Sequence, residues 1–138
     1  MNLTEILKSL EPVFIEGSQL ALKMQKGVSH HSKTNTGDSL TDIVTDADLA
    51  VQEFLLEKIS KTDLKNCRLL AEEDTPSVNK FNPNGEYYLA IDPIDATAVY
   101  SKGGQYFSTI ITLHNGKDIL YMFDVRLRHQ KLRRNHWL

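Results

Sequence analysis

The chain has 138 residues, a quarter of them charged and 41% hydrophobic, with a formal net charge of −2. This is enough for one domain with a buried core but not for two, and no run reaches the roughly 18 apolar residues of a membrane helix. Cys67 is the single cysteine, which excludes an internal disulfide. Because residues 1–10 have the pattern of an amphipathic helix and not of a signal peptide, we predict a cytoplasmic protein.

The first predicted element is an amphipathic helix over residues 3–24, in which apolar side chains recur at three- and four-residue intervals. Asn2 is the expected N-cap, with Glu5 three residues later. Pro12 should kink this helix or divide it in two, because proline lacks a backbone donor and clashes with the preceding turn. Residues 27–40 are rich in Ser, Thr, Asn, Gly and His, which predicts a loop.

A second helix is predicted to begin at Thr45, where Thr45 and Asp48 match the capping-box spacing, and to end near Lys61. Its buried stripe would consist of Ala47, Val51, Phe54, Leu55 and Ile59.

Four short β-rich runs follow, at residues 67–71, 87–91, 106–113 and 118–123, and residues 114–117 form a hairpin turn between the last two. Two helices followed by mostly consecutive strands predict an α+β fold with the helices on one face of a sheet.

Residues 126–138 hold five of the 16 basic residues and no acidic ones, so the remainder has 11 basic against 18 acidic residues, a net charge of −7. Such a tail suits contact with nucleic acid or an acidic membrane. A solvated or disordered segment explains it more simply, and the acidic body makes nucleic acid the weakest partner.

Acidic residues cluster directly after two predicted strands. Glu72, Glu73 and Asp74 follow the run at 67–71, and Asp92 and Asp95 follow the run at 87–91. If these strands are neighbours, the carboxylates converge on one pocket. Mg²⁺ prefers such oxygen ligands, combined with phosphate and water.

The Asp92–Asp95 segment, Asp-Pro-Ile-Asp, has a bend at Pro93 that lets both carboxylates point the same way, with the Ile94 carbonyl facing the site. The following residues resemble the first turn of a helix, whose free N–H groups suit a phosphate. A structural explanation is equally open here, with Asp95 as an N-cap and Asp92 as a turn residue.

Three motifs occur in order: Ile-Val-Thr-Asp-Ala-Asp at 43–48, Leu-Ala-Glu-Glu-Asp at 70–74 and Ala-Ile-Asp-Pro-Ile-Asp-Ala-Thr at 90–97. Over roughly residues 40–121 the chain thereby resembles the inositol monophosphatase family of lithium-sensitive, magnesium-dependent phosphatases. The resemblance implies the N-terminal half of the layered sugar-phosphatase fold shared with fructose-bisphosphatase, with helices packed on a mainly antiparallel sheet.

The resemblance also implies the site. Glu72, Asp92, the Ile94 carbonyl and Asp95 would bind two or three Mg²⁺ ions in relatives, and fewer here. The amides of Ala96 and Thr97 would hold phosphate. Thr97, with Asp48 as its partner and Glu72 beside it, would activate the water that attacks phosphorus directly. Asp48 has the capping-box role with Thr45 as an equal alternative. Glu73 would support the site from behind, and Asp74 would be a solvated turn residue.

Two departures from the family pattern concern the substrate and the length. Ala96 stands where the family usually has Gly. Together with Tyr100, it makes this segment resemble the inositol polyphosphate 1-phosphatase branch. The family's downstream Trp-Asp-x-Ala motif is missing, since Trp137 precedes the last residue. We therefore expect a truncated domain at residues 1–124 with a basic, non-family tail at 125–138.

Three functions follow as hypotheses. The first is a hydrolase acting on an inositol phosphate or a related small phosphate ester. The second is an inactive fragment that at most binds Mg²⁺, and whose exposed sheet invites self-association. The third is a nucleic-acid or anionic-surface module acting through the basic tail. No membrane partner is expected in the first two.

Overall fold

The computed structural model describes residues 2–32, 37–95, 99–100, 102–104, 107–126 and 131–135. The helices are α1 (Leu3–Ser9), α2 (Glu11–Ser32) and α3 (Gly37–Ile59), with short 3₁₀ helices η1 (Asp63–Asn66) and η2 (Pro76–Lys80). The strands are β1 (Arg68–Ala71), β2 (Tyr88–Asp95), β3 (Ser108–His114), β4 (Ile119–Arg126) and β5 (Lys131–Asn135).

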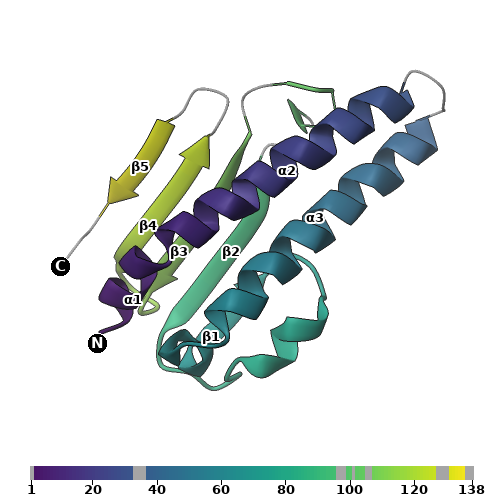
Figure 1. Cartoon of the computed structure of the whole chain (residues 1–138). Helices are drawn as coiled ribbons and strands as arrows, with labels where there is room; N and C mark the ends of the chain where they lie inside the picture. Colours follow the sequence, from purple (N-terminus) through teal and green to yellow (C-terminus); the bar gives the residue numbers. More distant parts are fainter. Residues whose placement is uncertain are drawn as a thin grey trace.

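The strands form one sheet in the order β1-β2-β3-β4-β5. The β1–β2 pair is parallel and the other pairs are antiparallel. The helices lie together on one face of this sheet, with α2 and α3 side by side (Figure 1). The predicted α+β class, with helices on a mainly antiparallel sheet, is therefore confirmed.

Pro12 divides the N-terminal helix, as its sequence position predicts. Helix α1 ends at Ser9 and α2 begins at Glu11, so that Pro12 occupies the first turn of α2, where its missing N–H is not needed. The side chain of Asn2 caps α1 by accepting a hydrogen bond from the Glu5 amide at 2.8 Å.

Two predicted helix boundaries are wrong. Residues 27–32 continue α2 and residues 37–40 begin α3, so both segments belong to helices and not to the predicted loop. Thr45 consequently lies inside α3, and the capping box of Thr45 with Asp48 is excluded. Helical stability comes mainly from packing, and two long helices packed side by side carry polar residues that local composition assigns to a loop.

Two strand predictions also change. Strand β2 continues past residue 91 to Asp95, with its pairing to β3 shifted between Asp92 and Asp95. Pro93 sits at this irregularity, where a missing N–H costs no ladder bond. Residues 131–135 of the basic tail form β5 on the free side of β4, so the solvated or disordered assignment is wrong for them. The domain boundary at residue 124 stays a prediction.

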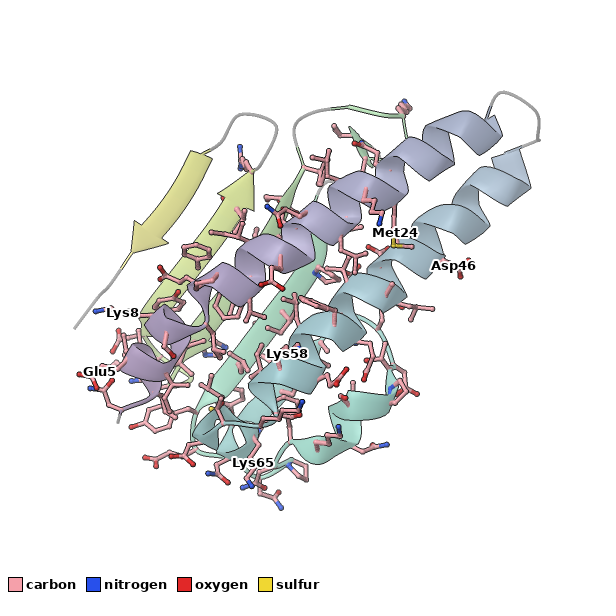
Figure 2. All side chains as sticks on the ribbon, in the orientation of Figure 1. Glu5, Lys8, Met24, Asp46, Lys58 and Lys65 are labelled. Atoms are coloured by element: carbon pink, nitrogen blue, oxygen red, sulfur yellow. The ribbon has the colours of Figure 1, made fainter. Side chains whose placement is uncertain are left out.

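The core lies between the two long helices and the sheet, where the side chains of both layers interdigitate (Figure 2). Its largest fully buried members include Phe14, Leu55, Tyr121 and Phe123. Tyr121 donates a hydrogen bond of 2.7 Å to Glu11, which joins the start of α2 to β4. No helix among the described residues is long and apolar enough to cross a membrane.

Gly85 supports the parallel pairing of β1 with β2 because the chain passes very close to its own backbone there. A Cβ at Gly85 would lie 2.5 Å from the Arg68 backbone nitrogen and the Asn66 backbone oxygen. Gly85→Ala should therefore lower the free energy of unfolding by roughly 2 kcal/mol or more, measured by urea denaturation.

The matched control is Gly116→Ala in the hairpin turn. Gly116 has φ +89°, and a Cβ there meets no atom nearer than 3.5 Å. Gly116→Ala should lower the free energy of unfolding by about 1 kcal/mol, because only the backbone conformation is unfavourable for alanine. Equal losses in the two variants would contradict the close approach at Gly85.

Candidate functional site

Three of the predicted site residues lie near the end of the β1–β2 ladder. In this parallel pair Ala71 lies opposite Ile91, so Glu72, just after β1, and Asp92, within β2, follow the last paired residues of the two strands. Helix α3 brings Asp48, which is 7% exposed, into the electrostatic neighbourhood of both. The expectation that the two strands are neighbours is confirmed, and the convergence of these carboxylates on one metal-binding pocket stays a prediction.

Asp48 is the most perturbed of these carboxylates. Burial, followed by repulsion from Glu72, Glu73 and Asp92, raises its pKa from 3.8 to about 7. It lies within helix α3, on the side that faces the protein interior. Its interior position therefore disfavours the charged form unless a cation is supplied.

Asp92 is shifted for related reasons. Burial is the largest cause, and repulsion from Glu72 and Asp95 adds to it, so that its pKa rises from 3.8 to about 6. A hydrogen bond with Glu72 acts in the same direction, while the Ile94 amide donates a hydrogen bond that acts against it. Burial and neighbouring negative charge therefore both disfavour the charged form of Asp92.

The donor chemistry fits a hard cation. Oδ1 of Asp48 and Oδ1 of Asp92 are buried and have no hydrogen-bond partner among the described residues. The charges that shift these two groups are all negative. A divalent ion with oxygen ligands, such as Mg²⁺, would satisfy these oxygens and remove the repulsion. Within the described ranges no three His, Cys, Asp or Glu side chains already converge as a metal-binding group, so an ion would have to draw them together.

The structure describes only some of the other predicted site residues. Asp95 is half-buried at the end of β2, and the Ile94 side chain is buried. Ala96 and Thr97 lie outside the described residues, so their phosphate-binding and catalytic roles stay predictions. Glu73 is half-buried, and Asp74 is exposed, as a solvated turn residue would be.

Two buried glutamines that sequence reasoning missed anchor the segments around this site. Gln52 on α3 bonds Glu73 and Thr75. Gln25 on α2 donates to the carbonyls of Tyr100 at 3.1 Å and Gly104 at 2.9 Å. The only signal in the sequence was a polar residue at a core-facing helical position.

Tyr100 is also fully buried, and its hydroxyl donates a hydrogen bond of 2.8 Å to the Ala21 carbonyl. Burial, with repulsion from Asp48 added, holds the pKa of Tyr100 well above its ordinary value. Tyr100 is therefore a neutral hydrogen-bond donor that ties the segment after β2 to helix α2.

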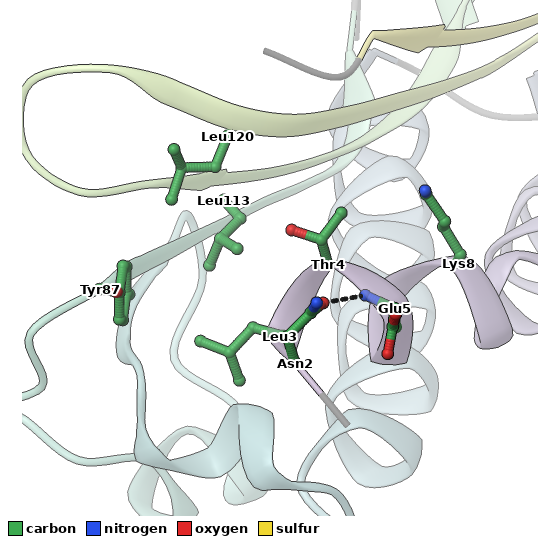
Figure 3. Close-up of a pocket in the computed structure, with 8 residues that line it drawn as sticks. All are labelled: Asn2, Leu3, Thr4, Glu5, Lys8, Tyr87, Leu113 and Leu120. Atoms are coloured by element: carbon green, nitrogen blue, oxygen red, sulfur yellow. Dashed lines mark hydrogen bonds between the residues drawn. The ribbon is translucent and has the colours of Figure 1, made fainter. Parts of the chain in front are cut away.

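A cavity of about 490 Å³ lies on the α3 side of this end, lined by residues of α2, α3 and the segment after β1, including Met24, Asp46, Glu53 and Asp74. A second cavity, of about 500 Å³, lies at the opposite end of β2, between α1 and the β3–β4 hairpin (Figure 3). It is lined mainly by the side chains of Leu3, Tyr87, Leu113 and Leu120, with Glu5 and Lys8 at its edge, and holds no carboxylate cluster.

Comparisons with known proteins identify the family and the fold. Residues 3–120 match the model of the inositol monophosphatase family. Over 70 residues, 51% of the chain, the sequence is 37% identical to the 3'(2'),5'-bisphosphate nucleotidase CysQ of Haemophilus influenzae, and the match covers 26% of that protein.

Solved structures share the fold. Mycobacterium tuberculosis SuhB has a TM-score of 0.71 at 16% identity, covering 99% of this chain and 46% of that one. The inositol monophosphatase from Anabaena (Nostoc) sp. PCC 7120 has a TM-score of 0.62 at 25% identity, covering 94% of this chain and 44% of that one. The chain thus spans less than half the length of each of these relatives.

The raised pKa of Asp48 predicts how the stability of the metal-free protein depends on pH. A carboxyl whose pKa is higher in the folded than in the unfolded state stabilises the fold below pH 4, and that contribution is lost as the pH rises to about 7. With chelator present, the free energy of unfolding should fall by roughly 2 kcal/mol between pH 5 and pH 8.

Urea denaturation at a series of pH values measures this slope. In Asp48→Asn, whose amide carries no charge at either pH, most of the slope should disappear. A wild-type stability that is flat or rises over this interval would contradict the burial of an uncompensated Asp48 carboxylate.

Proposed function

Because the chain belongs to the inositol monophosphatase family, we propose that it is a magnesium-dependent phosphomonoesterase. Its substrate would be an inositol phosphate or a related small phosphate ester. The observation that carries the proposal is the group of mutually repelling carboxylates beyond the end of the β1–β2 ladder, formed by the buried Asp48, the half-buried Asp92 and the exposed Glu72. A protein folds around such uncompensated charge when a cation belongs there.

Glu72, Asp92, Asp95 and the Ile94 carbonyl would hold the Mg²⁺ ions. When bound, the ions neutralise phosphate charge and make the attacking water more acidic. The chain provides the ligands from two strand ends, which are joined by the parallel β1–β2 ladder. Because the β1–β2 ladder is paired up to Ala71 and Ile91, Glu72 is one residue beyond paired backbone, and Asp92 is itself paired with Ile110 of β3.

Asp48 would take the proton. Its buried Oδ1 has no hydrogen-bond partner among the described residues, and its pKa of about 7 makes the carboxylate form a stronger base than an ordinary aspartate. We assign it as the acceptor of a proton from the Thr97 hydroxyl, which in turn would accept one from the attacking water. The amides of Ala96 and Thr97 would bind the phosphate, as the family resemblance implies.

The substrate class has two candidates within the phosphate monoesters. The residue types at Ala96 and Tyr100 resemble those of the family branch that acts on inositol polyphosphates, which favours an inositol phosphate. The 37% identity to a 3'(2'),5'-bisphosphate nucleotidase supports a bisphosphorylated nucleotide instead. Both are small molecules with two or more phosphates, so both belong in the assay.

A second candidate function is divalent-ion binding without turnover. It needs only the buried Oδ1 atoms of Asp48 and Asp92, which have no hydrogen-bond partner among the described residues and could take an ion whether or not a substrate is turned over. In this case association through the sheet face opposite the helices would also be expected, since Leu70 there is 45% exposed. A cytoplasmic location stays a prediction in both cases.

The proposed activity predicts Mg²⁺-dependent release of inorganic phosphate from an inositol bisphosphate or a 3',5'-bisphosphate nucleotide, inhibited by Li⁺. Asp92→Asn removes a charged ligand and should lower the rate about 100-fold or more. Colorimetric phosphate assays of purified wild type and variant measure this. Asp63→Asn, an exposed site on η1 at the opposite end of β1 from Glu72, is the matched control and should keep the wild-type rate.

The two candidate functions separate in the same experiment. Phosphate release no higher than that of Asp92→Asn, with a melting temperature that still rises on adding Mg²⁺, would favour ion binding without turnover. A melting temperature indifferent to Mg²⁺ and Mn²⁺ would contradict both.

A further inference from the structure

We infer that Gln52 is a positioning residue that holds the Glu72–Glu73 segment against helix α3 and thereby sets the geometry of the carboxylate cluster. This inference rests on the proposed function. Gln52 lies four residues after Asp48 on α3, so the two side chains project from the same face of the helix. One face of one helix therefore contributes both a member of the cluster and the anchor of the segment opposite.

The contacts of Gln52 are specific. Its Nε2 donates to the Glu73 carbonyl at 2.8 Å and to the Thr75 hydroxyl at 3.0 Å. Its Oε1 accepts from the Glu73 amide at 3.1 Å. Both protons of Nε2 are thus used, and the side chain is fully buried.

The two-way exchange with Glu73 fixes orientation as well as position. A side-chain amide that both donates to and accepts from one residue's backbone reproduces the pairing of an antiparallel strand. Residues 72–75 lie between β1 and η2, outside both elements. Gln52 therefore supplies backbone hydrogen bonds where the β1–β2 ladder has ended, directly next to Glu72.

A neutral amide suits this position better than a charged group. Glu72, Glu73 and Asp92 already repel Asp48, and a carboxylate at residue 52 would add to that repulsion. It also has no proton to donate to the Glu73 carbonyl. A cationic side chain would neutralise the cluster internally and so compete with a bound ion.

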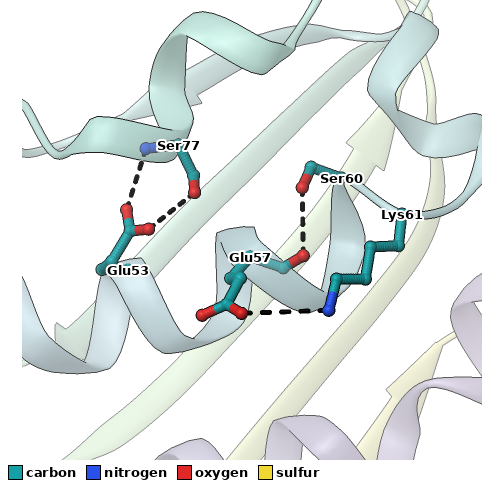
Figure 4. Close-up of polar contacts among 5 residues, drawn as sticks. All are labelled: Glu53, Glu57, Ser60, Lys61 and Ser77. Atoms are coloured by element: carbon teal, nitrogen blue, oxygen red, sulfur yellow. Dashed lines mark hydrogen bonds and ion pairs between the residues drawn. The ribbon is translucent and has the colours of Figure 1, made fainter.

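The neighbouring Glu53 has a separate task. Its carboxylate accepts from the Ser77 amide at 2.9 Å and from the Ser77 hydroxyl at 2.6 Å, which fastens the start of η2 (Figure 4). Burial acts to raise the pKa of Glu53, but the Ser77 hydrogen bonds outweigh it and lower the pKa. Two successive residues of α3 thus fasten two parts of the same connection, and Gln52 holds the part that carries Glu72.

The test compares ion affinity with stability in Gln52→Met, which keeps the length of the side chain and loses its amide. Isothermal titration calorimetry with Mg²⁺ and with Mn²⁺ should show Kd raised 10- to 100-fold, the range found when groups that orient metal ligands are removed. NMR hydrogen exchange should show loss of protection at the Glu73 amide, with protection in the β2–β3 ladder unchanged.

Thr62→Ala is the matched control for stability. Thr62 caps η1 at the far end of α3, where its hydroxyl oxygen accepts from the Leu64 amide at 3.2 Å and its hydroxyl donates to the Ile59 carbonyl at 2.7 Å. We expect both variants to lower the melting temperature by several degrees, and Thr62→Ala to keep Kd within about twofold of the wild type.

Gln52→Glu carries the test if Gln52→Met does not fold. It keeps an acceptor for the Glu73 amide and loses both donated hydrogen bonds. Its extra negative charge alone would strengthen ion binding, so a higher Kd in this variant would directly support the role of Gln52 in positioning the Glu72–Glu73 segment.

An unchanged Kd in Gln52→Met, a lower Kd in Gln52→Glu, or an unchanged exchange rate at Glu73 in Gln52→Met would overturn the role of Gln52 while leaving the proposed function standing. A wild-type chain that binds neither ion would overturn the proposed function, and the role of Gln52 with it.

Discussion

Repulsion between desolvated carboxylates at one end of the sheet is the constraint on which the rest of the structure depends. Asp48 and Asp92 are both buried enough for burial to be the largest cause of their raised pKa values. Placing such groups close together costs free energy, so they would move apart unless the surrounding backbone prevented it. The fold is best understood as the framework that prevents this.

Three features of the framework act together. The parallel β1–β2 ladder brings the ends of both strands to one edge. The irregularity between Asp92 and Asp95 turns the end of β2 without ending its pairing to β3. The two long helices each contribute a buried glutamine, Gln25 and Gln52, that fastens a connection beyond a strand end. Where regular hydrogen bonding stops, side-chain amides continue it.

This division of labour explains why the core and the site differ so much in character. The core between the helices and the sheet is closely packed and apolar. Its buried Tyr121 donates a hydrogen bond to Glu11 at the start of α2. The core provides the stability that the carboxylate cluster removes. Without a cation, the cluster lowers the folding stability, and the proposed cation would make it raise the folding stability instead. Ion binding and folding stability would therefore be coupled.

The sequence by itself determined the family and the α+β class. Pro12 predicted the division of the first helix because it lacks a backbone donor. Carboxylates placed directly after β-rich runs predicted that Glu72 and Asp92 lie near each other, although β2 continues beyond Asp92 to Asp95. These signals are local, so they can be recognised without knowing what packs against them.

Only the tertiary structure decided the boundaries of the helices and strands. Residues 27–32 and 37–40 are helical because packing outweighs a loop-like composition, and β5 forms because β4 offers it an edge. The role of Gln52 was invisible for the same reason. Its partners, Glu73 and Thr75, are more than 20 residues away in the chain, and a side-chain hydrogen bond over that distance depends on how the helix packs on the sheet.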